Sequence, residues 1–230
     1  MTAPIEMIAI VIPARDEHDG VGRAVEAAQL SRRVLALSHP AIETALLVVA
    51  DACVDDTVDE ARAAGAEVIE VGFGNVGAAR AAGIEHLRRR FDGDPVAVWI
   101  ASTDADSIVP AEWLAGQVRE ADGGADAVIG TVTPAFAAMT DRQVATWQAT
   151  HVPGVANGHV HGANLGVRLS SYLAVGGYPP LAVSEDVELV ENLRAHGATI
   201  VASAAVDVIT SSRLDARAPQ GYSAYIAGLG

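Results

Sequence analysis

Two aspartates one residue apart, Asp104 and Asp106, are the side chains in this sequence best placed to do chemistry. They follow the apolar run 96–100, whose composition is typical of a buried strand. Alternate residues at a strand end can direct two carboxylates to different tasks, and hard divalent cations prefer oxygen ligands. We therefore expect one of the two to contact a nucleotide and the other to bind Mg²⁺ or Mn²⁺, which would neutralise a diphosphate.

The same spacing occurs at Asp92 and Asp94, so two neighbouring acids alone carry little information. That pair precedes the strand and stands beside a glycine and a proline, which is typical of a turn. Position after the strand is what distinguishes Asp104 and Asp106. A capping turn remains the alternative for them.

A glycine-rich segment offers a competing nucleotide site. Gly72, Gly74 and Gly77 match the G-x-G-x-x-G pattern, follow a short apolar run and open a helical stretch, as a dinucleotide fingerprint requires. An NAD(P)-binding oxidoreductase is therefore an alternative. Against it, the preceding run carries Glu67 and Glu70, which favour the edge of a sheet, whereas a dinucleotide-binding strand is buried on both faces.

Composition and charge narrow the class of protein. The net charge of −14 argues against a nucleic-acid partner, which would require clustered Lys and Arg. Half of the residues are apolar and few are aromatic, which favours one α/β domain over residues 1–230. Cys53 is the only cysteine, and the sequence shows neither a signal-peptide pattern nor an apolar run of the roughly 20 residues that cross a bilayer. We expect a cytoplasmic protein without a transmembrane segment.

Apolar runs alternate with stretches of helical length and spacing along about the first 130 residues. This alternation predicts a doubly wound sheet with helices on both faces. Ligands bind such sheets outside the carboxyl ends of the strands, which makes the polar residues after each strand the candidate site. We expect strands at 7–13, 45–50, 68–71, 96–100 and 127–130, and helices at 21–37, 56–64, 76–90 and 111–121.

The second half of the chain is less regular and has the character of an acceptor-side elaboration. It holds a His- and Gly-rich stretch at 151–162, an apolar segment at 163–167, a helix at 184–196 and a strand at 199–202. We expect about 1–130 to be the nucleotide-binding half and about 131–213 the acceptor half. The tail 214–230 has no readable role.

Four segments taken together resemble the inverting glycosyltransferases of family 2, which have the GT-A fold. The likeness extends to about residue 213 and implies an α/β/α sandwich around a mixed sheet, with a Rossmann-like nucleotide-binding half. The segments are IVIPARDE at 10–17, VVADACVDDT at 48–57, NVGAARAAG at 75–83 with the acidic pair, and GANLGVR at 162–168 with VGGY at 175–178 and SEDVEL at 184–189.

The resemblance implies metal-dependent transfer of a sugar, with inversion, from a nucleoside diphosphate sugar to a hydroxyl group of a small-molecule, glycan or lipid acceptor. In it, Asp186 is the general base, and the neighbouring Glu185 can raise the pKa of that base. Asp106 binds Mg²⁺ or Mn²⁺. The donor contacts that the resemblance implies are Pro13, Ala14, Arg15, Glu17, Asp51, Arg80, Asp104 and Ala105.

Some features depart from the family pattern or stay open. Asp16, Ala50 and Cys53 stand where the family has an asparagine, an acid and a serine. These changes leave the nucleobase open and keep a nucleotide-binding relative without catalysis as an alternative. The third metal ligand is unassigned, because histidines in a flexible loop such as 151–161 are more often solvated than bound to metal. Residues 210–213 (TSSR) could close over the diphosphate.

Overall fold

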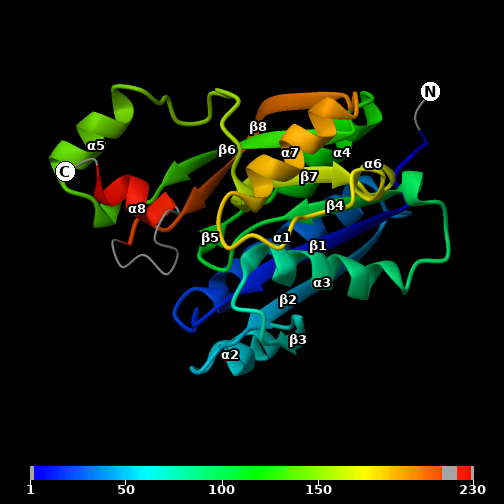
Figure 1. Ribbon diagram of the computed structural model, residues 1–230, viewed down its shortest axis with the longest axis horizontal. Helices are drawn as coiled ribbons and strands as arrows, with labels where there is room; N and C mark the ends of the chain where they lie inside the picture. Colours follow the sequence, from blue (N-terminus) through cyan, green and yellow to red (C-terminus); the bar gives the residue numbers. More distant parts are fainter. Residues whose placement is uncertain (1–2, 214–221, 229–230) are drawn as a thin grey trace.

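The structure, a computed structural model, describes residues 3–213 and 222–228. Its strands are β1 (Met7–Ala14), β2 (Glu43–Asp51), β3 (Glu67–Val71), β4 (Val98–Ser102), β5 (Ser107–Ile108), β6 (Ala127–Pro134), β7 (Leu165–Arg168) and β8 (Ile200–Thr210). They form an eight-stranded sheet in the order β3-β2-β1-β4-β7-β6-β8-β5 (Figure 1). β7 and β5 run antiparallel to their neighbours and the other pairs are parallel, so the sheet is mixed, as predicted.

Helices cover both faces of the sheet, which gives the expected α/β/α sandwich (Figure 1). The helices α1 (Val21–Ser38), α2 (Thr57–Ala63) and α4 (Trp113–Asp122) pack into one hydrophobic cluster, and α3 (Val76–Arg88), α6 (Leu169–Ala174) and α7 (Glu185–Ala195) pack into the other. β1 contributes to both clusters, because Ile8 and Ile10 face the first and Ala9 and Val11 face the second. This central strand is buried on both faces, as its apolar sequence requires.

The order of the strands explains where a ligand can bind. β2 and β3 lie on one side of β1, and β4 lies on the other. The order in which strands are added to the sheet therefore reverses between β1 and β4. A crevice forms at such a point, outside the carboxyl ends of the parallel strands. β3 lies at the edge of the sheet, as we expected from the two glutamates in its sequence. Glu67 forms ion pairs there with Arg90 and His86.

Several of the expected strand boundaries are wrong, and the strand expected at 127–130 extends to Pro134 as β6. The strand expected at 96–100 begins only at Val98, because Pro95 opens a short 3-10 turn in which Asp94 accepts a hydrogen bond from the backbone of Val96. The strand expected at 199–202 extends to Thr210, because β8 pairs with β6 on both sides of a bulge between Gly130 and Thr131. The turn expected around Asp92 and Asp94 is confirmed by this capping bond.

Two further helices, α5 (Asp141–Gln148) and α8 (Tyr222–Ala227), lie beside each other beyond the end of the sheet (Figure 1). Gln143 Nε2 donates a hydrogen bond to the carbonyl of Ile226 at 3.2 Å, and the side chains of Ile226 and Trp147 are buried. The described part of the tail, residues 222–228, therefore packs back against α5. Within the described ranges, no helix is both long enough and apolar enough to cross a membrane.

Candidate active site

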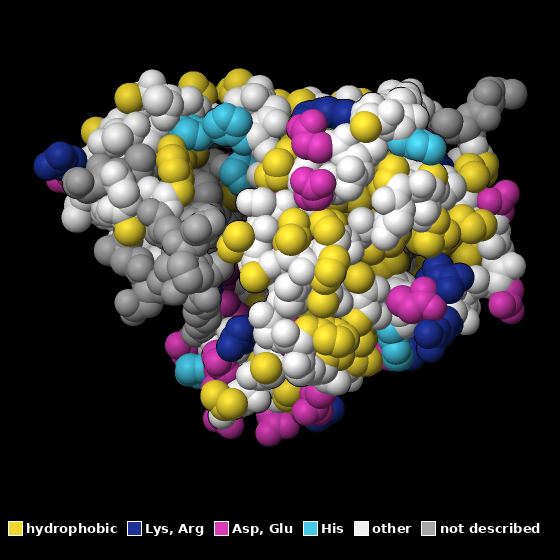
Figure 2. Space-filling view, viewed as in Figure 1, with side chains coloured by type: hydrophobic (Ala, Val, Ile, Leu, Met, Phe, Trp, Pro, Cys, Tyr) yellow, Lys and Arg dark blue, Asp and Glu magenta, His cyan; other side chains and the backbone are white. Residues whose placement is uncertain are grey.

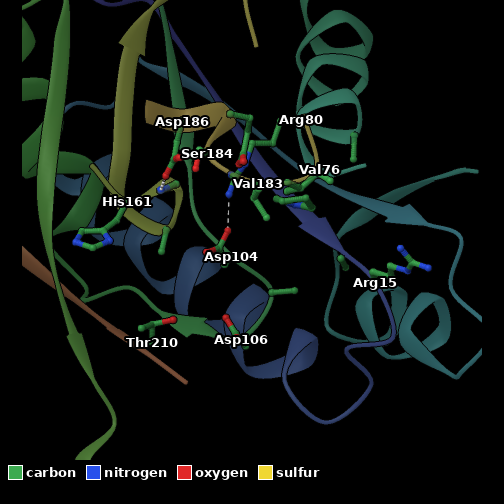
Figure 3. A pocket seen from close by; sticks show the side chains of 18 of the residues that line it. Arg15, Val76, Arg80, Asp104, Asp106, His161, Val183, Ser184, Asp186 and Thr210 are labelled. Carbon is green, nitrogen blue, oxygen red and sulfur yellow. Dashed lines mark hydrogen bonds and ion pairs between the residues drawn. The ribbon is translucent and has the colours of Figure 1, made fainter. Parts of the chain in front are cut away.

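A cleft with a cavity volume of about 610 Å³ opens at the carboxyl ends of β1, β2 and β4 (Figure 3). This volume lies within the range of roughly 300–1,000 Å³ that is typical of small-molecule sites. The structure brings every site residue expected from the sequence to its lining: Pro13, Ala14, Arg15, Glu17, Asp51, Arg80, Asp104, Ala105, Asp106, Glu185 and Asp186. Segments from both halves of the chain therefore meet at this cleft.

Arg80 joins the two halves of the cleft. Its side chain is only 2% exposed, and it donates from Nη2 to Asp104 Oδ1 at 2.5 Å and from Nε to Glu185 Oε1 at 3.1 Å (Figure 3). Burial alone would lower the pKa of Arg80, but Asp104, Tyr178 and Glu185 raise it overall, so the guanidinium stays charged. Burial raises the pKa of Glu185, against the pull of Arg80. Arg80 thus holds one carboxylate from each half.

Asp186 lies on the first turn of α7 and is tied to the opposite loop. Its Oδ2 accepts a hydrogen bond from the backbone of Gly162 at 2.6 Å, and its Oδ1 accepts one from the backbone of Val187 at 2.8 Å. Ser184 occupies the N-cap position with φ +61°, and its side chain makes no capping hydrogen bond. A carboxylate fixed in this way at the cleft can accept a proton from a bound hydroxyl group.

Asp104 and Asp106 follow β4 on either side of the buried Ala105. Asp106 is mostly buried, and its Oδ2 lies 3.4 Å from Nη2 of Arg213. Burial raises the pKa of Asp106 to about 6, and the charge of Asp104 adds to the rise. Carboxylate oxygens whose negative charge is incompletely neutralised suit a hard divalent cation.

Within the described residues, Asp106 does not belong to any group of three side chains close enough to hold an ion by themselves. The group that does satisfy this distance criterion, Asp16, Cys53 and Asp55, lies outside the cleft lining. Asp55 there accepts hydrogen bonds from His18 and Thr57. A cation at Asp106 would therefore need oxygens from a substrate, which is how Mg²⁺ often binds phosphates in proteins.

Arg213 is a cleft residue that the sequence indicated only as part of a segment that could close over a diphosphate. Its Nη1 donates to Glu17 Oε2 at 2.6 Å, and its Nη2 pairs with the other oxygen of Glu17. The antiparallel pairing of Ser107 with Thr210 delivers residues 210–213 to the side of Asp106. Sequence reasoning missed this placement because it ended the last strand eight residues too early, at 202 rather than 210.

The glycine-rich loop bonds mainly within the protein. Asp51 accepts hydrogen bonds from the backbone of Gly74 at 2.8 Å and of Asn75 at 2.7 Å. A Cβ atom at Gly77 would lie 2.1 Å from the carbonyl oxygen of Pro179. A dinucleotide fingerprint offers such backbone groups to a pyrophosphate, so this geometry argues against the oxidoreductase alternative.

The turn after β1 lines one side of the cleft. Pro13 and Ala14 end the strand, and the exposed side chain of Arg15 points away from Asp104 and Asp106 (Figure 3). On the opposite side His161 lines the cleft, and burial lowers its pKa. The sequence had shown His161 only as one member of a histidine-rich loop.

The chain belongs to glycosyl transferase family 2, because the model of this family matches residues 9–169. The solved structures that it resembles confirm the GT-A fold that the sequence predicted. A search of curated proteins found no match.

Solved structures share this fold at low sequence identity. They include a mannosyltransferase from Pyrobaculum calidifontis in complex with GDP-Man and Mn²⁺, with a TM-score of 0.63 and 16% identity over 97% of this chain and 60% of that one. They also include TarS 1-349 of S. aureus, with a TM-score of 0.60 and 12% identity over 98% of this chain and 69% of that one. A third is the glucosyl-3-phosphoglycerate synthase of M. tuberculosis, with a TM-score of 0.53 and 14% identity over 97% of this chain and 76% of that one. The chain thus spans less than two thirds of the mannosyltransferase.

Proposed function

We propose that this chain transfers a sugar, with inversion and with the help of a divalent metal, from a nucleoside diphosphate sugar to a hydroxyl group. The observation that carries the proposal is that Asp186 and the pair Asp104 and Asp106 face one cleft from two halves of the chain, with Arg80 between them. Inverting transfer needs a base on one side of the sugar carbon and a stabilised leaving group on the other.

On the donor side, Arg213 is the cation poised for the diphosphate. In the structure it pairs with Glu17 and approaches Asp106, so it is held at the cleft before any substrate binds. A guanidinium can bind phosphate oxygens through two parallel hydrogen bonds. Asp51 and the backbone of Pro13 and Ala14 would line the nucleoside.

Asp106 would hold the Mg²⁺ or Mn²⁺, together with oxygens of the diphosphate. The residues present fit such an ion, because the carboxylate is mostly buried and its pKa is raised to about 6 by burial and by Asp104. When bound, the ion would neutralise charge on the leaving diphosphate. Mn²⁺ in the structure of the Pyrobaculum calidifontis mannosyltransferase supports this assignment. A third protein ligand stays unassigned.

On the acceptor side, Asp186 takes the proton of the attacking hydroxyl group. The N–H of Gly162 orients the carboxylate toward the cleft. Glu185, which we expected to share the catalytic role, acts through Arg80 instead, because it is buried and its Oε1 is bonded to the guanidinium. Glu185 is therefore a positioning residue in this proposal.

Thermal unfolding with UDP, GDP, dTDP and NAD, each with and without Mn²⁺, tests the proposed donor site. A ligand at about 100 times its Kd stabilises the folded chain by about 2.7 kcal/mol, so one nucleoside diphosphate should raise Tm, and more so with Mn²⁺. Asp106→Asn should lose the effect of Mn²⁺, while the exposed Asp92→Asn should keep it. Stabilisation by NAD alone, indifferent to metal, would contradict the proposal.

A relative that binds nucleotides without catalysis remains the second candidate, motivated by Ala50 and Cys53 at positions where the family has an acid and a serine. Turnover separates the two functions. If a nucleoside diphosphate binds but no nucleotide sugar is ever hydrolysed or used for transfer, the second candidate holds. The cytoplasmic location stays a prediction.

A further inference from the structure

Four aromatic side chains form a cluster that reaches the cleft through Tyr225, and we define this aromatic wall as Trp147, His151, His159 and Tyr225. The rings of Trp147 and His151 stack with centroids 4.8 Å apart and an interplanar angle of 17°. The rings of His159 and Tyr225 meet His151 edge to face at 5.5 and 6.0 Å. Histidine side chains gather on this face next to the α5 end of the molecule (Figure 2).

The aromatic wall has a buried ring at its inner end, Trp147, and an exposed ring at the cleft, Tyr225. Trp147 is 1% exposed and anchors the stack, whereas Tyr225 is 41% exposed and lines the cleft. Tyr225 reaches this place because α8 packs against α5 through Gln143 and Ile226. Aliphatic side chains of Val132, Val160 and Val187 complete this part of the lining. An exposed ring beside apolar side chains offers a flat surface for a ligand with an apolar face.

The charges of the cleft disfavour an anionic ligand near this wall. Six acids and three arginines line the cleft, which gives six minus three, or three net negative charges: Glu17, Asp51, Asp104, Asp106, Glu185 and Asp186 against Arg15, Arg80 and Arg213. Arg80 and Arg213 already pair with carboxylates. An anion entering beside the carboxylate of Asp186 would meet repulsion that is strong in a partly buried site.

His161 also lines the cleft and feels the charge of Asp186, but it does not offset that repulsion. Burial lowers the pKa of His161, although Asp186 opposes the change, so the imidazole is neutral at neutral pH. The fixed positive charge on this side among the described lining residues is Arg80, and its guanidinium is already bonded to Asp104 and Glu185.

We propose that the acceptor is an uncharged sugar whose apolar ring face stacks on Tyr225 while one of its hydroxyl groups lies at Asp186. This inference rests on the proposed function and specifies its substrate class. A pyranose has an apolar face of C–H groups and a rim of hydroxyl groups, which matches the exposed ring, the aliphatic lining and the neutral imidazole.

Matched pairs of acceptors test the charge argument. The donor is the nucleotide sugar whose diphosphate stabilises the chain most, and the pairs are glucose with glucuronate and mannose with mannose 6-phosphate. Release of nucleoside diphosphate and formation of product are measured together. The neutral member of each pair should have a kcat/KM higher by about tenfold or more, in line with a charge repulsion of roughly 1.4 kcal/mol.

Variants of Tyr225 test the stacking argument. Tyr225→Ala should raise KM for the neutral acceptor by about three- to tenfold, as the loss of one ring contact implies, whereas Tyr225→Phe keeps the ring and should restore most of the affinity. Phe73→Ala removes an exposed ring that does not line the cleft and should leave this KM unchanged. Nucleotide affinity, measured by thermal shift, should change much less than KM in Tyr225→Ala.

The outcomes separate the acceptor proposal from the proposed function. Preference for the anionic member of a pair, an unchanged KM in Tyr225→Ala, or no response to neutral sugars while the donor is hydrolysed would each overturn the acceptor proposal. Absence of both nucleotide binding and donor hydrolysis counts against the proposed function instead.

Discussion

Glu185 and Asp186 are adjacent in the sequence, yet the fold gives them different environments. Glu185 is 5% exposed and bonds to Arg80, whereas Asp186 is partly exposed and bonds to the backbone of Gly162. Successive residues of a helix point about 100° apart, so one turn can serve two purposes. The sequence indicated the pair but not this division, because the contacts with residues 80 and 162 are set by tertiary packing.

At this scale the most informative substitution for stability is Arg80→Ala. It leaves the carboxylate of Glu185 buried without its charged partner, which typically destabilises a protein by about 3–5 kcal/mol. Urea unfolding should show a loss of this order. Arg88→Ala on the same helix removes an exposed pair with Glu85 and should change the free energy of unfolding much less. Equal effects of the two substitutions would contradict the role given to Arg80.

Asp106 gives a prediction with a defined pH dependence. Its pKa of about 6 in the folded chain exceeds the ordinary value of 3.8, so the folded state binds its proton more tightly than the unfolded state does. Without metal, this carboxylate therefore destabilises the fold progressively as pH rises from about 4 to 6. Asp106→Asn should stabilise the metal-free chain at pH 7.5 by about 2 kcal/mol, and the gain should vanish near pH 4.

Chemical denaturation of both proteins at several pH values, in the presence of EDTA, measures this difference. Asp92→Asn is the control, because Asp92 is exposed, and it should show no comparable gain. If Asp106→Asn is less stable than the wild type at pH 7.5, the result contradicts our account, in which the ionised carboxylate of Asp106 lowers the stability of the metal-free fold.

At the scale of elements, the sequence predicted what local patterns determine. The strands β1 and β2, the helices between the early strands and the position of the acidic pair after β4 follow from apolar runs and helical spacing. β5 has two residues, and the second part of β8 follows a bulge, so both depend on pairing with distant strands and leave no clear local pattern. The delivery of Arg213 to the cleft was missed for the same reason.

The start of α3 offers a test of why its glycines are there. Gly77 packs against the loop at Pro179, where a Cβ atom would lie 2.1 Å from a carbonyl oxygen, whereas a Cβ atom at the exposed Gly72 would meet nothing within 4 Å. Gly77→Ala should destabilise the chain by about 1–3 kcal/mol, and Gly72→Ala by less than about 0.5 kcal/mol. Loss of nucleotide binding in Gly72→Ala, with stability unchanged, would instead favour the dinucleotide fingerprint.

At the scale of the whole molecule, the cleft exists only because the two halves of the chain share one sheet. The nucleotide half supplies Asp51, Arg80 and the acidic pair, and the second half supplies Asp186, while the ends of β8 and α8 close the cleft with Arg213 and Tyr225. In the proposed function, the excess of acids would make binding of the diphosphate depend on a few cations. This arrangement would allow a chain of net charge −14 to bind an anionic donor.

The central claim, that Asp186 is the base of a glycosyl transfer, is tested most directly by the rate of transfer in Asp186→Asn. Wild type and variant are compared with the same nucleotide sugar and acceptor, at concentrations that saturate the donor site. Because a positioned general base contributes about 10²- to 10⁴-fold, the variant should transfer at least about a hundredfold more slowly while it binds the nucleotide as tightly. Transfer at the rate of the wild type would contradict the account.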